Sequence, residues 1–93
     1  MKVLITARHF SISEKTRKHV EEDVQQLLKI FDRITSVNIV FEKIKDYEYE
    51  TDIVVNVPLK TLTIHEKADE MSKSLDIALE KMRRQLKKYK EQL

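Results

Sequence analysis

The sequence predicts an α+β fold in which two roughly parallel helices cover one face of a four-stranded mixed sheet. The prediction rests on an apolar, β-branched start, on alternating segments in the middle of the chain, and on two stretches with an apolar residue every three or four positions. These patterns give the order β-α-β-β-β-α. Because 93 residues build one compact core, we expect one domain over residues 1–93.

The first two elements are a strand and a helix. Apolar and β-branched side chains predict the strand over residues 2–7. Ser11 and Ser13 both offer helix N-caps, and Ser11 stands three residues before Glu14, which is the spacing of a capping box. The helix that follows ends near Asp32. Its apolar stripe, at i, i+4, i+7, i+8 and i+11, consists of Val20, Val24, Leu27, Leu28 and Phe31.

Three strands follow this helix. Residues 36–44 and 47–57 alternate between apolar and polar side chains, and Pro58 ends the second segment because it cannot donate a ladder hydrogen bond. Leu62 and Ile64 mark the fourth strand. The helical connection makes the first two strands parallel through a right-handed crossover, whereas the short connections make the later pairs antiparallel.

The closing segment gives the strongest helical pattern of the chain. Asp69 is its expected N-cap. Both helices bury their apolar stripes if they pack on one face of the sheet, where the chain direction makes them roughly parallel. The apolar positions of the closing helix are Met71, Leu75, Ala78, Leu79, Met82, Leu86, Tyr89 and Leu93.

Composition excludes several classes of protein. The chain has neither cysteine nor glycine, which excludes disulfides, thiol catalysis and glycine-rich phosphate loops. Its three histidines lack metal-binding spacing, and Glu48, Glu50 and Asp52 alternate as expected for a solvent-facing strand. We expect a protein that is not an enzyme and has no metal, cofactor or small-molecule substrate. Without an apolar run of membrane-spanning length or a signal-peptide core, we also expect a cytoplasmic protein with no membrane contact.

The net charge of +2 conceals three segments of different charge. Residues 1–18 carry five basic side chains and one acidic one, residues 19–80 carry seven and fourteen, and residues 81–93 carry six and one. Segregated charge indicates a partner rather than a fold. The positive charge at both ends of the chain indicates that the partner is a polyanion.

The closing helix has more cations than its dipole explains. A cation near a helix C-terminus gains about 0.3–1 kcal/mol, but six cations and no anion lie between positions 81 and 90. Lys81, Arg84 and Lys88 form one ridge at a one-turn spacing of about 5.4 Å, which suits a phosphate backbone. The opposite side of the apolar stripe carries Arg83, Lys87 and Lys90.

The first helix has cations where its dipole favours anions. Lys15, Arg17 and Lys18 lie near its start, and an i, i+4 pair between Glu14 and Lys18 relieves only part of the cost. Arg17 is in line with the apolar stripe, toward the sheet. We expect an external anion to explain this cluster better than folding stability does.

Aromatic side chains give little support for base stacking. Tyr47 and Tyr49 share a strand face with Ile53 and Val55, so we expect cross-strand packing. The glycine-bearing aromatic signature of an RNA-recognition motif is absent.

Several short motifs resemble those of a known family. In the closing helix, the segments that resemble its D-M-x-x-A-I-D…K-L-x-R-Q-L-x-K pattern are Glu70-Met71, Leu75-Asp76, Lys81-Met82 and Arg84-Gln85-Leu86-x-Lys88. Other matching segments are Val3-Leu4-Ile5-Thr6, Ser13-Glu14 with Arg17 and Val20, and Phe31-Asp32-Arg33-Ile34. On these motifs the chain resembles the bacterial ribosome hibernation-promoting factor and ribosome-associated inhibitor family (protein Y, formerly sigma-54 modulation proteins), in its short form. It departs from the family in Glu70, in Ser72, and in lacking glycines around the last two strands.

The resemblance implies a fold reminiscent of double-stranded-RNA-binding domains and a role in ribosome hibernation. It implies binding to 16S rRNA of the small ribosomal subunit, in the channel for tRNA and mRNA, which inhibits translation in stress or stationary phase. Off the ribosome we expect a monomer. The expected RNA-binding residues are Arg8, Lys15, Arg17, Lys18, Lys81, Arg83, Arg84, Lys87 and Lys88. Two alternatives stay open: a protein-interaction module that docks through its amphipathic last helix, and a general double-stranded-RNA binder.

Overall fold

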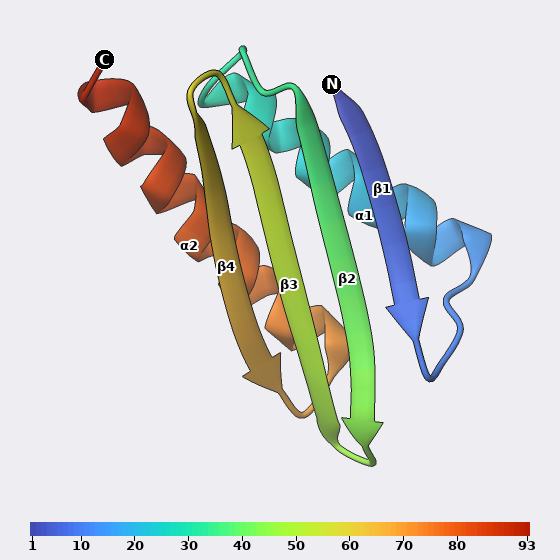
Figure 1. Ribbon diagram of the computed structural model, residues 1–93. Helices are drawn as coiled ribbons and strands as arrows, with labels where there is room; N and C mark the ends of the chain where they lie inside the picture. Colours follow the sequence, from blue (N-terminus) through green and yellow to red (C-terminus); the bar gives the residue numbers. More distant parts are fainter.

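The computed structural model describes residues 1–93 as a four-stranded sheet backed by helices (Figure 1). The strands lie in the order β1-β2-β3-β4; β1 pairs with β2 in parallel, and the other two pairs are antiparallel. The predicted element order and mixed sheet are confirmed. The elements are β1 (Lys2–Arg8), α1 (Glu14–Gln25), a 3-10 helix η1 (Gln26–Lys29), β2 (Ser36–Lys45), β3 (Glu48–Val57), β4 (Lys60–Ala68) and α2 (Met71–Glu91).

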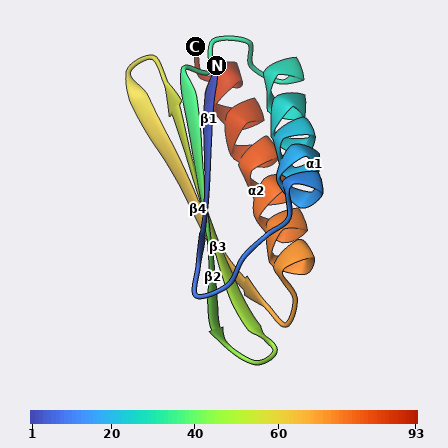
Figure 2. The same cartoon turned by 90° about the vertical axis from the view of Figure 1, so that its right-hand side faces the viewer.

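Both helices lie on the same face of the sheet and run roughly parallel, as predicted (Figure 2). The core fills the space between the helices and the sheet and contains 19 buried apolar residues. Val20 and Val24 of α1 contribute to it, as does the α2 stripe from Leu75 to Tyr89. Leu93 lies beyond α2 and is 63% exposed, so the sequence pattern extended this stripe too far. The opposite face of the sheet is left uncovered, and it presents the other half of each alternating strand.

One polar pair is buried within the apolar core. The hydroxyl groups of Thr51 on β3 and Ser74 on α2 are 2.6 Å apart, and Ser74 also donates to the carbonyl oxygen of Met71 at 2.8 Å. Both residues are fully buried. No buried polar side-chain atom lacks a hydrogen-bond partner, so α2 is fixed on the sheet without the cost of an unsatisfied group.

Ser13, one of the two N-caps predicted for the first helix, is confirmed, whereas the other predicted helix ends differ from the structure. Ser13 is the N-cap of α1 and accepts a hydrogen bond from the Thr16 amide at 3.1 Å, so the capping box based on Ser11 is wrong. The α-helix stops at Gln25 and continues as η1, which ends before Asp32. At α2 the N-cap is Glu70, whose side chain makes no capping hydrogen bond; the predicted cap, Asp69, pairs instead with Lys73 at 3.1 Å. None of the helices has the length and hydropathy needed to cross a bilayer.

The strand ends show how the chain turns without glycine. Tyr47 and Leu59 sit in the tight connections β2–β3 and β3–β4 with φ values of 61° and 73°, a region that most non-glycine residues avoid. Tyr47 is 83% exposed, so its predicted cross-strand packing is wrong: the turn removes it from the strand. Tyr49 does pack, edge-on against Phe10. β4 extends to Ala68, further than the apolar pattern indicated, because it pairs with β3 along its whole length.

Candidate nucleic-acid interface

The ridge on α2 faces the edge strand β4. Lys81 forms an ion pair with Glu66 of β4, and Lys88 lies in a shallow depression that also includes Lys60. Arg84 is paired within the helix, with an Arg84 Nη2 to Glu80 Oε1 distance of 2.7 Å. All three cations are exposed. The Arg84–Glu80 pair is exposed on both sides and contributes about 0–1 kcal/mol, so a phosphate group can take the place of Glu80 at small cost. The Glu66 side chain is only 17% exposed, so Lys81 is held more firmly by its partner.

The opposite side of α2 faces α1 and η1. Arg83, Lys87 and Lys90 are exposed on it, and none has a carboxylate within 4.0 Å. Lys90 shares a depression with Lys29 and Arg33, which come from η1 and the loop after it. The guanidinium of Arg33 lies 5.3 Å from the centre of the Phe31 ring, which holds it at this surface.

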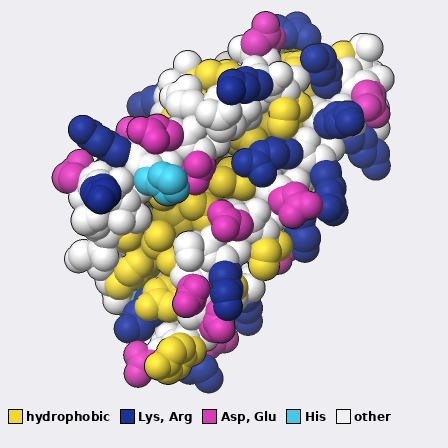
Figure 3. All heavy atoms as spheres, turned by 180° about the vertical axis from the view of Figure 1, so that it is seen from behind, with side chains coloured by type: hydrophobic (Ala, Val, Ile, Leu, Met, Phe, Trp, Pro, Cys, Tyr) yellow, Lys and Arg dark blue, Asp and Glu magenta, His cyan; other side chains and the backbone are white.

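Cations from three parts of the chain therefore lie close together at the C-terminal end of α2: from η1 and the loop after it, from β4, and from α2 itself. Figure 3 shows Lys and Arg side chains gathered along the edge that α2 forms. Sequence reasoning missed three of them because each stands alone in the acidic middle of the chain, where no pattern marks it. We call this surface the basic pole; it consists of Lys29, Arg33, Lys60, Arg83, Lys87, Lys88 and Lys90.

The cations of α1 form a separate group. Lys15 and Lys18 are exposed and have no acidic partner within 4.0 Å; the expected pair between Glu14 and Lys18 is replaced by a Glu14–Arg17 contact of 3.8 Å. An apolar band between the two helices separates this group from the cations of α2 (Figure 3). The structure thus places both groups on the helical side of the molecule without joining them.

Arg17 and Arg8 have different surroundings. Arg17 donates from Nη1 to the carbonyl oxygen of Ile5 on β1 at 2.8 Å, and its side chain is 34% exposed. An internal acceptor therefore accounts for this cation near the start of α1, where an external anion was expected. Arg8 lies at the end of β1 and points to the face opposite Ile5, with Glu42 as its neighbour in register. It is not brought together with the helical cations.

The uncovered face of the sheet carries a group of carboxylates. Glu42 and Glu50 are neighbours in register, and Asp52 follows Glu50 on the same face of β3. His65 of β4 contacts both Asp52 and Glu50, and its pKa is raised above 6.5, chiefly because the Asp52 carboxylate accepts its hydrogen bond. No cluster of side chains in the structure has the make-up of a metal site. Lys2, Arg8 and Lys67 lie on the same face, so this face carries both signs and lacks the surplus of cations found at the basic pole.

Solved structures with the same fold include ribosomal subunit interface proteins. A ribosomal subunit interface protein from Coxiella burnetii has the same fold, with a TM-score of 0.86, 28% identity, and coverage of 97% of this chain and 98% of that one. The N-terminal domain of protein Y from Thermus thermophilus superposes with a TM-score of 0.84 at 18% identity, covering 96% of this chain and 99% of that one. This second likeness concerns the fold alone.

The sequence then gives the family. Residues 3–93 match the family described as Sigma 54 modulation protein / S30EA ribosomal protein, and the chain belongs to it. A ribosome hibernation promoting factor from Azotobacter vinelandii is 30% identical over 93 residues, with 98% of this chain and 84% of that protein covered. One from Pseudomonas putida is 26% identical over 91 residues, with 98% and 88% covered. The resemblance identified from the motifs is thereby confirmed.

Proposed function

We propose that this protein is a ribosome hibernation factor. It binds 16S rRNA of the small ribosomal subunit in the tRNA and mRNA channel, and it inhibits translation in stress or stationary phase by occupying that space. It acts in the cytoplasm as a monomer that needs no cofactor. The names of the relatives and the family membership support this role.

The observation that carries the proposal is the basic pole. It brings exposed cations from η1, β4 and α2 to one end of the helical side, while the uncovered sheet face carries carboxylates. A surface of this kind is suited to phosphates of folded RNA, whose backbone rather than its bases is accessible to side chains. In this proposal the helical side, which carries the basic pole, faces the rRNA.

The proposed contacts fall into three groups. On α2, Arg83, Lys87 and Lys88 are free to bind phosphate directly, and Lys81 and Arg84 exchange a carboxylate for phosphate. Lys15 and Lys18 bind a second RNA segment across the apolar band. Arg17 contacts RNA at the border of the helical side while it holds the Ile5 carbonyl. Arg8 contacts RNA separately, from the uncovered face of the edge strand β1.

A charge-reversal pair tests the proposal. The variant carries Arg83→Glu, Lys87→Glu and Lys88→Glu, whose side chains have no internal acidic partner. The control carries Lys2→Glu, Lys45→Glu and Lys67→Glu, which changes the net charge equally but lies on β1, β2 and β4 outside the basic pole. Co-sedimentation with purified 30S subunits should fall at least tenfold for the variant and less than threefold for the control. Equal losses would reject the basic pole as the binding surface.

Two further measurements separate this role from its alternatives. Excess RNA duplex should compete poorly for the protein against 30S subunits; competition at equal concentration would indicate a general double-stranded-RNA binder. Addition of the protein to a purified translation system should lower peptide synthesis in proportion to ribosome occupancy. Ribosome binding without any loss of synthesis would contradict the inhibitory role.

A further inference from the structure

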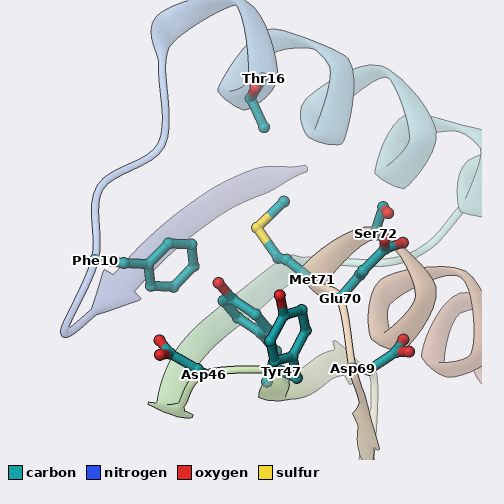
Figure 4. A pocket seen from close by; sticks show the side chains of 9 residues that line it. Phe10, Thr16, Asp46, Tyr47, Asp69, Glu70, Met71 and Ser72 are labelled. Carbon is teal, nitrogen blue, oxygen red and sulfur yellow. The ribbon is translucent and has the colours of Figure 1, made fainter.

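A depression at the far end of α2 from the basic pole is not explained by RNA binding. It has a volume of about 710 Å³ and opens between the β1–α1 loop, the β2–β3 turn and the start of α2 (Figure 4). Since α2 has 21 residues and rises about 1.5 Å per residue, this depression and the basic pole lie at opposite ends of a long helix. A partner at one does not block the other.

The walls of the depression are aromatic. Phe10 and Tyr49 contact each other edge-on with ring centres 5.5 Å apart, and Met71 lies beside them. Tyr47 stands at the open side, where its positive φ holds the residue in the turn and leaves its side chain in solvent. Figure 4 shows the Phe10 ring pointing from the β1–α1 loop into the pocket, and the Met71 side chain lying between the tyrosine rings and Thr16. An exposed aromatic ring beside two anchored ones is a surface that a flat or cationic group covers.

The rim of the depression is acidic. Asp46 and Asp69 lie on either side of Tyr47, and Glu70 lies above Asp69 (Figure 4). Asp46 is 3.3 Å from Lys43, and Asp69 is 3.1 Å from Lys73, so two of the carboxylates have exposed cationic neighbours outside the lining. Glu70 has no cationic side chain within 4.0 Å and does not cap α2. No Lys or Arg lines the depression itself.

From this combination we propose that the depression binds an arginine side chain of a partner protein. The guanidinium stacks on the Tyr47 ring, as arginine does on aromatic faces, and is attracted by the carboxylates of the rim, Asp46, Asp69 and Glu70. The aliphatic part of the arginine side chain then covers Met71 and Phe10. A nucleotide does not suit the site, because stacking its base on Tyr47 brings its phosphate among three carboxylates.

An NMR titration of the free protein tests this inference without ribosomes. The probe is the peptide acetyl-Gly-Arg-Gly-amide, and its control carries citrulline, which has nearly the same shape without the charge. The arginine peptide should shift the amide signals around Phe10, Tyr47 and Met71, with an affinity at least fivefold above that of the citrulline peptide. Equal affinities, or shifts confined to other residues, would overturn the proposal.

Two variants locate the contact. Tyr47→Ala should weaken binding of the arginine peptide at least threefold, and Tyr47→Phe should restore most of it because the ring is kept. Leu59→Ala is the matched control, since Leu59 is also exposed, has a positive φ and lies in the other tight turn; it should bind as the unaltered protein does. A short oligouridine that shifts the same signals where the arginine peptide does not would assign the site to nucleic acid and reject the proposal.

Because these readouts use the isolated protein, they do not depend on the ribosome assay. Loss of 30S binding in the basic-pole variant leaves the peptide titration unaffected, and loss of peptide binding in Tyr47→Ala leaves the rRNA contacts in place. The two proposals therefore succeed or fail separately.

Discussion

Arg17 of α1 and Ile5 of β1 are joined by a hydrogen bond from the guanidinium Nη1 to the backbone carbonyl, at 2.8 Å. β1 is an edge strand whose one neighbour in the sheet is β2. The bond therefore fixes the position of α1 against the edge of the sheet.

Replacing Arg17 with Met should destabilise the protein by about 1–2 kcal/mol, because a charge-assisted hydrogen bond is lost while the apolar stem is kept. Lys18→Met, one residue further along, should change the free energy of unfolding by less than about 0.5 kcal/mol, since its exposed side chain has no partner. Urea denaturation of the two variants measures the difference. If both variants unfold at the midpoint of the unaltered protein, the bond does not stabilise α1.

The buried hydroxyl pair predicts non-additive substitutions. Ser74→Ala removes the partner of the Thr51 hydroxyl and should cost about 1–3 kcal/mol, because that group is left buried and unpaired. Adding Thr51→Val should recover part of the loss, since no polar group is then left unsatisfied. A thermodynamic cycle from urea or thermal denaturation gives the coupling energy. Additive losses would show that the two hydroxyl groups do not depend on each other.

His65 predicts a pH dependence of stability. Its pKa in the folded protein is raised, chiefly by the hydrogen bond to Asp52, so the folded state binds the proton more tightly than the unfolded state does. This contribution is fully present below about pH 6.5, the ordinary pKa of histidine, and is lost as the pH rises through the raised value. The difference in urea midpoint between the protein and His65→Gln should therefore be larger at pH 5.5 than at pH 8.5.

The effect should be small, because half of the His65 side chain is exposed and solvent screens the pair. Glu50 faces the same ring and Lys67 neighbours it on β4, so Lys67→Gln serves as a control that leaves the ring and both carboxylates in place. If the difference in urea midpoint between the protein and His65→Gln instead grew with pH, the raised pKa assigned to His65 would be wrong.

Ribosome binding should depend strongly on salt. If about six phosphates are neutralised, the logarithm of the association constant should fall against the logarithm of salt concentration with a slope of about −4 to −5. The Arg83, Lys87 and Lys88 reversal should reduce the magnitude of that slope by roughly two or more. Binding to 30S subunits measured between 50 and 200 mM salt (about the range over which such effects are large) checks this. A slope near zero would remove the electrostatic mechanism.

Local patterns were sufficient to predict most of the fold. Alternation predicted β2 and β3 to within a residue or so, and the stripe from Leu75 to Tyr89 predicted the buried face of α2. The errors lie at element ends. Asp69 and Ser11 have the side chains of N-caps, but the cap is decided by where the preceding chain leaves the sheet, which places Glu70 and Ser13 in those positions.

The candidate site was predicted only in part for a related reason. The cations of α2 are adjacent in sequence and stand out against its dipole, whereas Lys29, Arg33 and Lys60 reach the basic pole from elements far apart in the chain. Arg17 shows the opposite case: its position against the dipole suggested an external anion, and a carbonyl on another element accepts its hydrogen bond.

The amino-acid sequence by itself determined the element order, the apolar faces and the segregation of charge, because each depends on residues within a few positions of one another. The tertiary structure alone decided which cations share a surface, which have internal partners, and that Tyr47 is presented to solvent beside Phe10 and Met71. Those properties depend on distances between elements, and these distances exist only once the helices have packed on the sheet.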